Sequence, residues 1–154
     1  MPNYKVSWPQ GGEIDIMEAR GRITNIVSSA LHFGNSFFDK DFIVQQVVIP
    51  PSLKFQEKFH SITMEWKEDS IKMFLDSESI PYMTIHRDDE AFAEYGYPFN
   101  NQYYLIINVA VGGKYDNYLN DRSAFCRNKE CSNKAEPDQH RFIIDWIEYE
   151  SISP

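Results

Sequence analysis

The chain has 154 residues, of which 25% are charged and 15% are aromatic, and its formal net charge at pH 7 is −8. Proteins bind nucleic acid through clustered Lys and Arg, so this acidic composition argues against a nucleic-acid partner. No apolar run approaches the roughly 20 residues that a membrane-spanning helix needs, which argues against a membrane partner. Residues 1–8 contain no apolar signal-peptide region, and the sequence does not indicate an oligomeric state.

The predicted elements are β-strands apart from one helical turn, so the expected fold class is all-β. Runs rich in branched and aromatic residues, separated by turn signals, are typical of strands. The expected strands are Glu13–Ala19, Ile23–Phe33, Phe42–Val48, Phe59–Trp66, Ser70–Leu75, Met83–His86, Tyr103–Val111 and Arg141–Tyr149. The residues between Trp66 and Ile71 indicate a hairpin turn. The segment from Asp88 to Tyr95 is expected to form one helical turn, with Asp88 or Asp89 as its cap.

The first predicted strand carries three carboxylates in an apolar context, at Glu13, Asp15 and Glu18. Side chains of a regular strand alternate between its two faces, which would place Glu18 opposite the other two acids. One β-bulge near Ile16 and Met17 would shift the phase by one residue and bring all three acids to one face.

Two interpretations of these acids are open. The first is a solvated strand face that is acidic by chance, as happens often in a chain with 25% charged residues. The second is a carboxylate pair for glycoside hydrolysis, in which one group is the nucleophile and the other is first the general acid and then the general base. An acid between the pair would help to separate their pKa values.

Trp8 and His32 are candidate substrate-binding residues near this strand. Trp8 lies five residues before Glu13 and could stack on a sugar ring, or it could be a core residue that caps the sheets. A single His in a strand is more often structural than functional, whereas the Leu-His-Phe-Gly context of His32 also suits a residue that faces a cleft.

The predicted strand Tyr103–Val111 has two phases. One phase is entirely apolar and is expected to face the space between two sheets; its members are Leu105, Ile107, Val109 and Val111. Asn108 lies on the other phase, where its amide could bond sugar hydroxyls or satisfy a neighbouring backbone group.

The acids lie in the segment Trp8–Gly21, which resembles the active-site strand of glycoside hydrolase family 16. Within that family, Glu-x-Asp-x-x-Glu with an extra bulge residue, here Met17, is typical of the laminarinase-like β-1,3-glucanases, and the lichenase branch carries the shorter Glu-x-Asp-x-Glu. Four more segments resemble family segments and follow in the family's order. They are Ala30–Gly34, Phe59–Asp76, Pro98–Gly113 and Phe142–Tyr149.

The resemblance implies a jelly-roll β-sandwich of the concanavalin A-like type. It covers nearly all of residues 1–154, but all-β sandwiches commonly run to about 200–250 residues. We therefore expect the chain to be a partial catalytic domain, about the C-terminal three-fifths of it, without the N-terminal strands of the sandwich.

The resemblance also implies retaining hydrolysis of internal β-1,3-glucosidic bonds in laminarin-type β-glucans, outside the cell. Glu13 would be the nucleophile, Glu18 the general acid and then the base, and Asp15 would orient Glu13. The substrate-binding residues would be Trp8, His32 and Asn108. The alternatives are a non-catalytic β-glucan-binding protein on the same fold, whose known relatives typically lose one or both glutamates, and an inactive truncated remnant.

No cofactor and no metal site are expected. Asp145 resembles a family position that can contribute to a structural calcium site, whose other ligands would come largely from the N-terminal part of the family domain. Cys126 and Cys131 could form a local disulfide or remain free thiols, and they make a poor zinc site. Asn100 and Asn101 depart from the family's usual Asp-Gln, so fine specificity does not follow from the resemblance.

Overall fold

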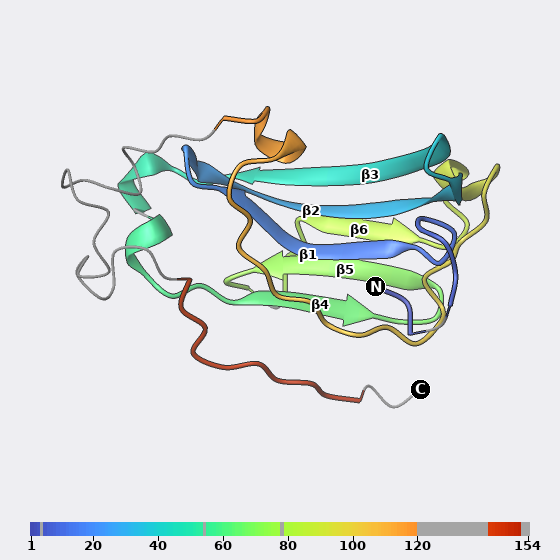
Figure 1. Ribbon diagram of the computed structural model, residues 1–154. Helices are drawn as coiled ribbons and strands as arrows, with labels where there is room; N and C mark the ends of the chain where they lie inside the picture. The colour runs from blue at the N-terminus through green and yellow to red at the C-terminus, as the bar shows by residue number, and fades with distance from the viewer. Residues whose placement is uncertain (4, 54, 78, 120–141, 152–154) are drawn as a thin grey trace. The chain divides into compact units, whose positions relative to one another are not determined.

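The computed structural model describes residues 1–3, 5–53, 55–77, 79–119 and 142–151. The chain forms two compact units, Met1–Ile106 and Ile107–Pro154, and each is described by itself. All six strands of the described residues lie in the first unit and form two antiparallel sheets (Figure 1). Cys126 and Cys131, with the expectations that concern them, lie outside the described residues.

The first sheet has the strand order β1-β2-β3. Its strands are β1 (Glu13–Arg20), β2 (Ile23–Ser36) and β3 (Asp39–Val48). Short turns join neighbouring strands, as expected of antiparallel pairs. Strands β2 and β3 are longer than predicted, because their pairing continues to Ser36 and Asp39 at the tip of the hairpin.

The second sheet has the order β4-β5-β6. Its strands are β4 (Ile62–Trp66), β5 (Ser70–Leu75) and β6 (Met83–His86). The predicted hairpin turn between β4 and β5 is present, and the Lys67 amide donates to the Ser70 carbonyl at 2.8 Å.

Short 3₁₀ helices connect the strands. They are η1 (Pro51–Leu53), η2 (Phe55–Glu57) and η3 (Glu90–Phe92) in the first unit and η4 (Lys114–Asp116) in the second. The predicted helical turn near Asp88 is η3, and Asp89 holds its N-cap position without a side-chain cap bond. The Asp89 carboxylate instead accepts from the His86 amide at 2.8 Å. None of the helices in the described ranges is long and apolar enough to cross a membrane.

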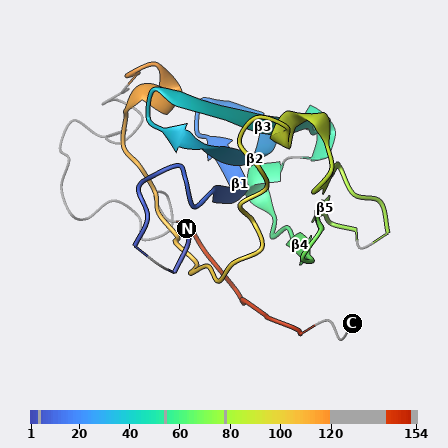
Figure 2. The same cartoon turned by 90° about the vertical axis from the view of Figure 1, so that its right-hand side faces the viewer.

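The hydrophobic core lies between the two sheets, which pack as two layers (Figure 2). Strand β2 contributes alternate residues to it, including Leu31 and Phe33, which are 0% and 1% exposed. The second sheet contributes Ile71 and Met73, and the chain after β6 adds Phe99. The period-two alternation of β2 therefore directs one face into this core, and in the middle of the strand the residues of the other face are buried as well.

A glycine shapes the entry into β1. Gly12 has a φ of +76°, and a Cβ at this position would lie 2.7 Å from the Phe99 ring and 2.7 Å from the Tyr103 hydroxyl. The Tyr103 hydroxyl donates to the Gly11 carbonyl. The left-handed backbone at Gly12 and the closeness of the two aromatic side chains therefore both require glycine directly before the acidic strand.

Gly12→Ala is expected to lower the free energy of unfolding by about 2–4 kcal/mol, because the left-handed backbone and the overpacking both oppose a side chain. Gly96→Ala is the matched control. Gly96 has the same φ of +76°, and a Cβ added there would have no heavy atom within 4 Å. Urea unfolding of the two variants should show the larger loss at Gly12, and equal losses would rule out the steric part of the explanation.

Two predicted strands are wrong. In the predicted strand Tyr103–Val111, only Tyr103 pairs, through an isolated bridge to Pro2. The Tyr104 amide still donates to the Met1 carbonyl at 2.9 Å, but residues 105–111 make no backbone hydrogen bond to another described segment. Leu105 is 56% exposed and does not face the space between the sheets. An alternating apolar pattern needs a neighbouring strand to become a ladder.

The second wrong prediction is Arg141–Tyr149. Its described residues, 142–149, form no strand. The segment is rich in the β-branched and aromatic residues that are typical of strands. Such a composition shows that the side chains would fit a β-sheet, but it does not by itself make the backbone form one.

Candidate active site

A β-bulge lies in β1 between Asp15 and Glu18. Asp15 pairs with Ala30 of β2, and Glu18 pairs with Ser28. The two residues between the acids therefore stand opposite a single residue of β2, which is the arrangement of a bulge. The structure confirms the bulge that the sequence predicts near Ile16 and Met17.

The bulge brings three carboxylates to one face of the first sheet. The residues of β2 that pair with the acids are spaced by two, so they share one face, and the acids opposite them share it as well. The acids are Glu13, Asp15 and Glu18, and their partners are His32, Ala30 and Ser28. All three acids are half-buried. The opposite face of β2 carries the core residues Leu31 and Phe33, so the acids lie on the face that points away from the core.

Two of the acids, Asp15 and Glu18, have raised pKa values. Burial, followed by the negative charges of Glu13 and Glu18, raises the pKa of Asp15 to about 7. Burial, together with the charge of Glu13, also raises the pKa of Glu18, although Arg20 lowers it. Asp15 and Glu18 therefore retain protons at a pH at which an ordinary carboxyl group is ionised. Such groups can donate a hydrogen bond or a proton.

Asp15→Asn is expected to flatten the dependence of stability on pH between about pH 4 and 7. In the wild type the pKa of Asp15 is about 7 when folded and about 3.9 when unfolded. The folded state therefore binds more protons in this window, and its stability falls as the pH rises. The three-unit difference corresponds to an upper limit of about 4 kcal/mol.

Urea unfolding of both proteins at pH 4, 5, 6 and 7 measures this effect. The difference between wild type and Asp15→Asn isolates Asp15, because the pKa of Glu18 is shifted by burial, Arg20 and Glu13, which the substitution leaves in place. Parallel stability curves over the whole window would show that Asp15 ionises normally in the folded protein.

Trp8 lies against the nucleophile candidate. Its indole Nε1 donates to the Glu13 carboxylate at 2.6 Å. The turn before β1 holds it there, with the Gln10 amide donating to the Ser7 carbonyl at 2.8 Å. A charged acceptor strengthens such a bond, so Trp8 orients Glu13 in addition to offering a ring for stacking. The sequence predicts the ring and does not predict this hydrogen bond.

His32 lies beside the central acid. Its Nε2 is 3.4 Å from the nearer carboxylate oxygen of Asp15. Burial lowers the pKa of His32, which outweighs the effect of the Glu13 charge. Because the pKa of Asp15 is about 7 and that of His32 is lowered, near neutral pH His32 is largely uncharged and Asp15 is protonated in about half of the molecules. The His32 ring also lies 6.2 Å from the Trp8 ring, between their centroids.

The tip of the β2–β3 hairpin adds two residues that the sequence analysis missed. The Lys40 ammonium lies 4.3 Å from the Trp8 ring centroid and 3.9 Å from that of Phe37. The Trp8 and Phe37 rings are themselves 5.8 Å apart. Phe37 is 58% exposed, and the only signal in the sequence is the Phe-Phe pair at a turn, where large apolar residues are uncommon.

Asn108, the third predicted substrate-binding residue, belongs to the second unit and is exposed. Its role stays a prediction. The structure brings His32 to the acids through the pairing of β2 with β1, and it brings Trp8 to them from the turn before β1.

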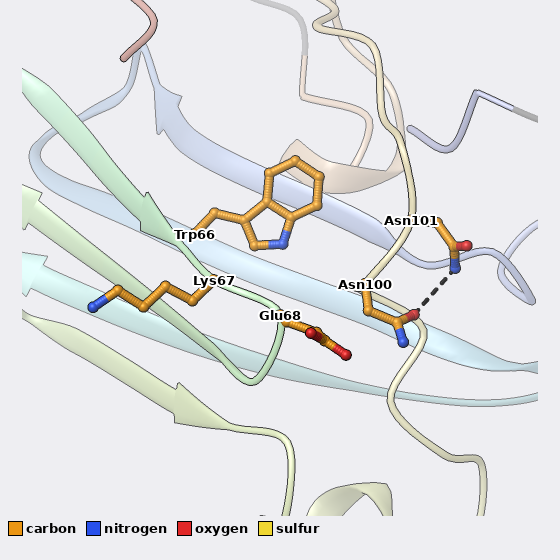
Figure 3. Close-up of a pocket in the computed structure, with 5 residues that line it drawn as sticks. All are labelled: Trp66, Lys67, Glu68, Asn100 and Asn101. Atoms are coloured by element: carbon orange, nitrogen blue, oxygen red, sulfur yellow. Dashed lines mark hydrogen bonds between the residues drawn. The ribbon is translucent and has the colours of Figure 1, made fainter. Parts of the chain in front are cut away.

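A separate pocket lies in the first unit, at the end of β4 (Figure 3). The Asn101 amide donates to the Asn100 side-chain oxygen at 3.2 Å, and the Trp66 indole donates to the Phe99 carbonyl at 2.7 Å. The acids of β1 do not line this pocket, so we assign it no part in the chemistry. The residues around it are Trp66, Lys67, Glu68, Asn100 and Asn101.

No group of three or more His, Cys, Asp or Glu side chains within the described ranges is arranged to hold a metal ion. Asp145 belongs to no such group, and a calcium site that includes Asp145 stays a prediction. The absence of a cofactor stays a prediction.

Retaining glycosidases use a pair of carboxyl groups, and β1 carries candidates for such a pair on one face. The family model for "Glycosyl hydrolases family 16" matches residues 3–148. The chain belongs to this family, which confirms the predicted β-sandwich class. The laminarinase catalytic domain from Thermotoga maritima superposes with a TM-score of 0.63 and 32% identity, over 75% of this chain and 45% of that one.

Two curated relatives bear on the activity. Glucan endo-1,3-beta-glucosidase A1 of Niallia circulans is 34% identical over 112 residues, which cover 71% of this chain and 16% of the relative. A beta-1,3-glucan-binding protein of Penaeus monodon is 28% identical over 131 residues, which cover 69% of this chain and 34% of the relative. The chain thus spans less than half the length of these relatives.

Proposed function

We propose that the chain hydrolyses internal β-1,3-glucosidic bonds of laminarin-type β-glucans with retention of configuration. The observation that carries this proposal is the bulged pairing of β1 with β2, which places Glu13, Asp15 and Glu18 on one face. The endo-1,3-beta-glucosidase and laminarinase relatives support the substrate class.

In the first step the Glu13 carboxylate attacks the anomeric carbon and forms a glycosyl-enzyme ester. Glu18, whose pKa is raised by burial, gives its proton to the glycosidic oxygen as the bond from carbon to oxygen breaks. The chain that leaves therefore carries a new hydroxyl group. Trp8 holds Glu13 in place through its 2.6 Å hydrogen bond.

In the second step water attacks the anomeric carbon of the ester. The Glu18 carboxylate accepts the proton of the water, and Glu13 leaves as a carboxylate. Two inversions restore the β configuration. Asp15, with a pKa of about 7, is largely protonated below that pH and can then donate a hydrogen bond to Glu13.

Substrate binding is assigned to the aromatic and polar groups around the acids. The Trp8 ring is proposed to stack on a glucose ring next to the bond that is cleaved, and His32 to bond a sugar hydroxyl. Asn108 is proposed as a third substrate-binding residue, as the resemblance to the family implies. Nucleic acid and membranes are not proposed as partners, and we propose that the protein acts outside the cell without a cofactor.

A second candidate function is β-glucan binding without catalysis, which the Penaeus monodon relative supports. A binding protein does not need an acid with a raised pKa beside a nucleophile, and burial of such groups is unfavourable. The presence of both glutamates on one face therefore favours the enzyme.

A reducing-sugar assay of the purified chain on laminarin, lichenan and agarose tests the proposal. We expect new reducing ends from laminarin at a higher rate than from lichenan, and none from agarose. Retardation of the chain in gels that contain laminarin, without release of reducing ends, would establish the binding protein. Neither binding nor release would identify an inactive remnant.

A further inference from the structure

Ser29 is a polar residue in the apolar interior between the two sheets. It lies on the core face of β2, with Val27 and Leu31 on either side at 1% and 0% exposure, and is itself 0% exposed. A buried hydroxyl group is unfavourable unless it is hydrogen-bonded. A serine at this position therefore needs partners within the core.

Ser29 has two hydrogen-bond partners, which come from different sheets. Its hydroxyl donates to the Ile16 carbonyl of β1 at 2.6 Å, and the Tyr82 hydroxyl lies 2.5 Å from it. Serine has one hydroxyl proton, which it gives to Ile16, so Tyr82 is the donor in the second bond. Tyr82 is tied to the second sheet, because its amide donates to the Met73 carbonyl of β5 at 2.9 Å.

The Ile16 carbonyl belongs to the bulge. Asp15 pairs with Ala30 and Glu18 pairs with Ser28, so Ser29 is the residue of β2 that faces the bulge. An extra residue interrupts the ladder and leaves backbone groups without their usual partners. The Ser29 hydroxyl supplies a partner to one of these groups, and Tyr82 in turn fixes Ser29 from the other sheet.

We propose that Ser29 and Tyr82 are positioning residues that hold the bulge of β1 and thereby place Glu18 on the same face as Glu13. The consequence for catalysis rests on the proposed hydrolysis, whereas the placement of Glu18 does not depend on turnover. Without the bulge, regular alternation would direct Glu18 to the core face. A looser bulge would leave the acid in the sequence but misplace it relative to the nucleophile.

Three variants test the proposal. Ser29→Ala removes both hydrogen bonds, and Tyr82→Phe removes only the bond between the sheets without changing the shape of the ring. Tyr97→Phe is the matched control, because the Tyr97 hydroxyl is buried and has no hydrogen-bond partner among the described residues. Circular dichroism establishes which variants fold. If Ser29→Ala does not fold, the result for Tyr82→Phe decides the proposal.

Two readouts separate positioning from general stability. On a soluble β-1,3-gluco-oligosaccharide we expect Ser29→Ala to lower kcat by about 10–100-fold, the loss typical of a catalytic group that shifts by about 1 Å, with KM within about twofold of the wild type. In the second readout the Glu18 carboxyl group is titrated by ¹³C NMR. Its midpoint should move to higher pH in both test variants, because Glu18 turns toward the core face and burial is the main cause that raises its pKa, and it should not move in Tyr97→Phe.

The outcomes distinguish the two proposals. If the wild type releases no reducing ends from laminarin but the Glu18 midpoint moves as expected, the proposed hydrolysis fails and the positioning role stands. If the Glu18 midpoint and kcat are unchanged in the folded variants, the positioning role is overturned and the hydrolysis stands. An unchanged midpoint in an inactive chain would overturn both.

Discussion

Replacing Glu13 by Gln should abolish the hydrolysis of laminarin, with a loss of about 10⁴-fold or more in kcat, as is typical when a covalent nucleophile is removed. The amide has nearly the same size and can still accept the indole hydrogen bond that Trp8 makes to Glu13 at 2.6 Å. It has no negative charge with which to attack the anomeric carbon. The fold should therefore persist while the first step of the reaction stops.

The control for this variant is Glu68→Gln, which removes a carboxylate from the exposed turn between β4 and β5. Glu68 is paired with Arg87 at 3.7 Å and is 82% exposed, so its loss should leave kcat within about twofold of the wild type, as expected for an exposed ion pair. Initial rates on laminarin measure both variants. Substantial activity in Glu13→Gln would mean that another residue is the nucleophile.

Replacing Glu18 by Ala should have an effect that depends on the leaving group. On laminarin the glycosidic oxygen needs a proton, so we expect kcat to fall by about 10²–10⁴-fold. An aryl β-glucoside with an acidic phenol leaves without that proton, so formation of the ester should be nearly unimpaired. The ester should then accumulate, because no base activates water for the second step.

Azide tests this assignment directly, because it attacks the ester without needing a base. With the activated substrate, azide should restore turnover of Glu18→Ala and give a β-glycosyl azide. The same anion added to Glu13→Ala would occupy the place of the nucleophile and give an α-glycosyl azide. An exchange of the two products between the variants would reverse the assigned roles of Glu13 and Glu18.

The sequence predicts the acidic strand well, because its pattern is local. Three acids spaced as in Glu13–Glu18 share a face only if one residue is extra, and the structure has a bulge at that point. The hairpin between β4 and β5 is predicted for the same reason, since its turn residues lie next to each other in the chain. In both cases the interactions that decide the structure are between near neighbours.

Predictions that depend on distant partners are less successful. Tyr103–Val111 has a clear alternating pattern, yet only Tyr103 pairs, because a strand also needs a neighbour that the segment itself does not encode. The hydrogen bond between Trp8 and Glu13 and the position of Lys40 over the Trp8 ring depend on turn geometry and on the long β2–β3 hairpin. Neither contact can be predicted from the spacing of the residues in the sequence.

The size of the pKa shift at Asp15 could not be predicted from the sequence either. The pattern suggests that an acid between two others will hold its proton more tightly. The main cause is burial, followed by the charges of Glu13 and Glu18, and burial depends on how the chain around β1 folds over the strand. The direction was therefore predictable from the motif, but the value of about 7 was not.

The stereochemistry of hydrolysis tests most directly whether the bulged strand works as a nucleophile and an acid on one face. Proton NMR of a β-1,3-gluco-oligosaccharide, recorded within the first minutes of reaction with the wild-type chain, distinguishes the anomers before they interconvert. We predict that the β-anomer appears first and that the α-anomer grows only by mutarotation, because two displacements at one carbon retain its configuration. Initial release of the α-anomer would contradict nucleophilic attack by Glu13.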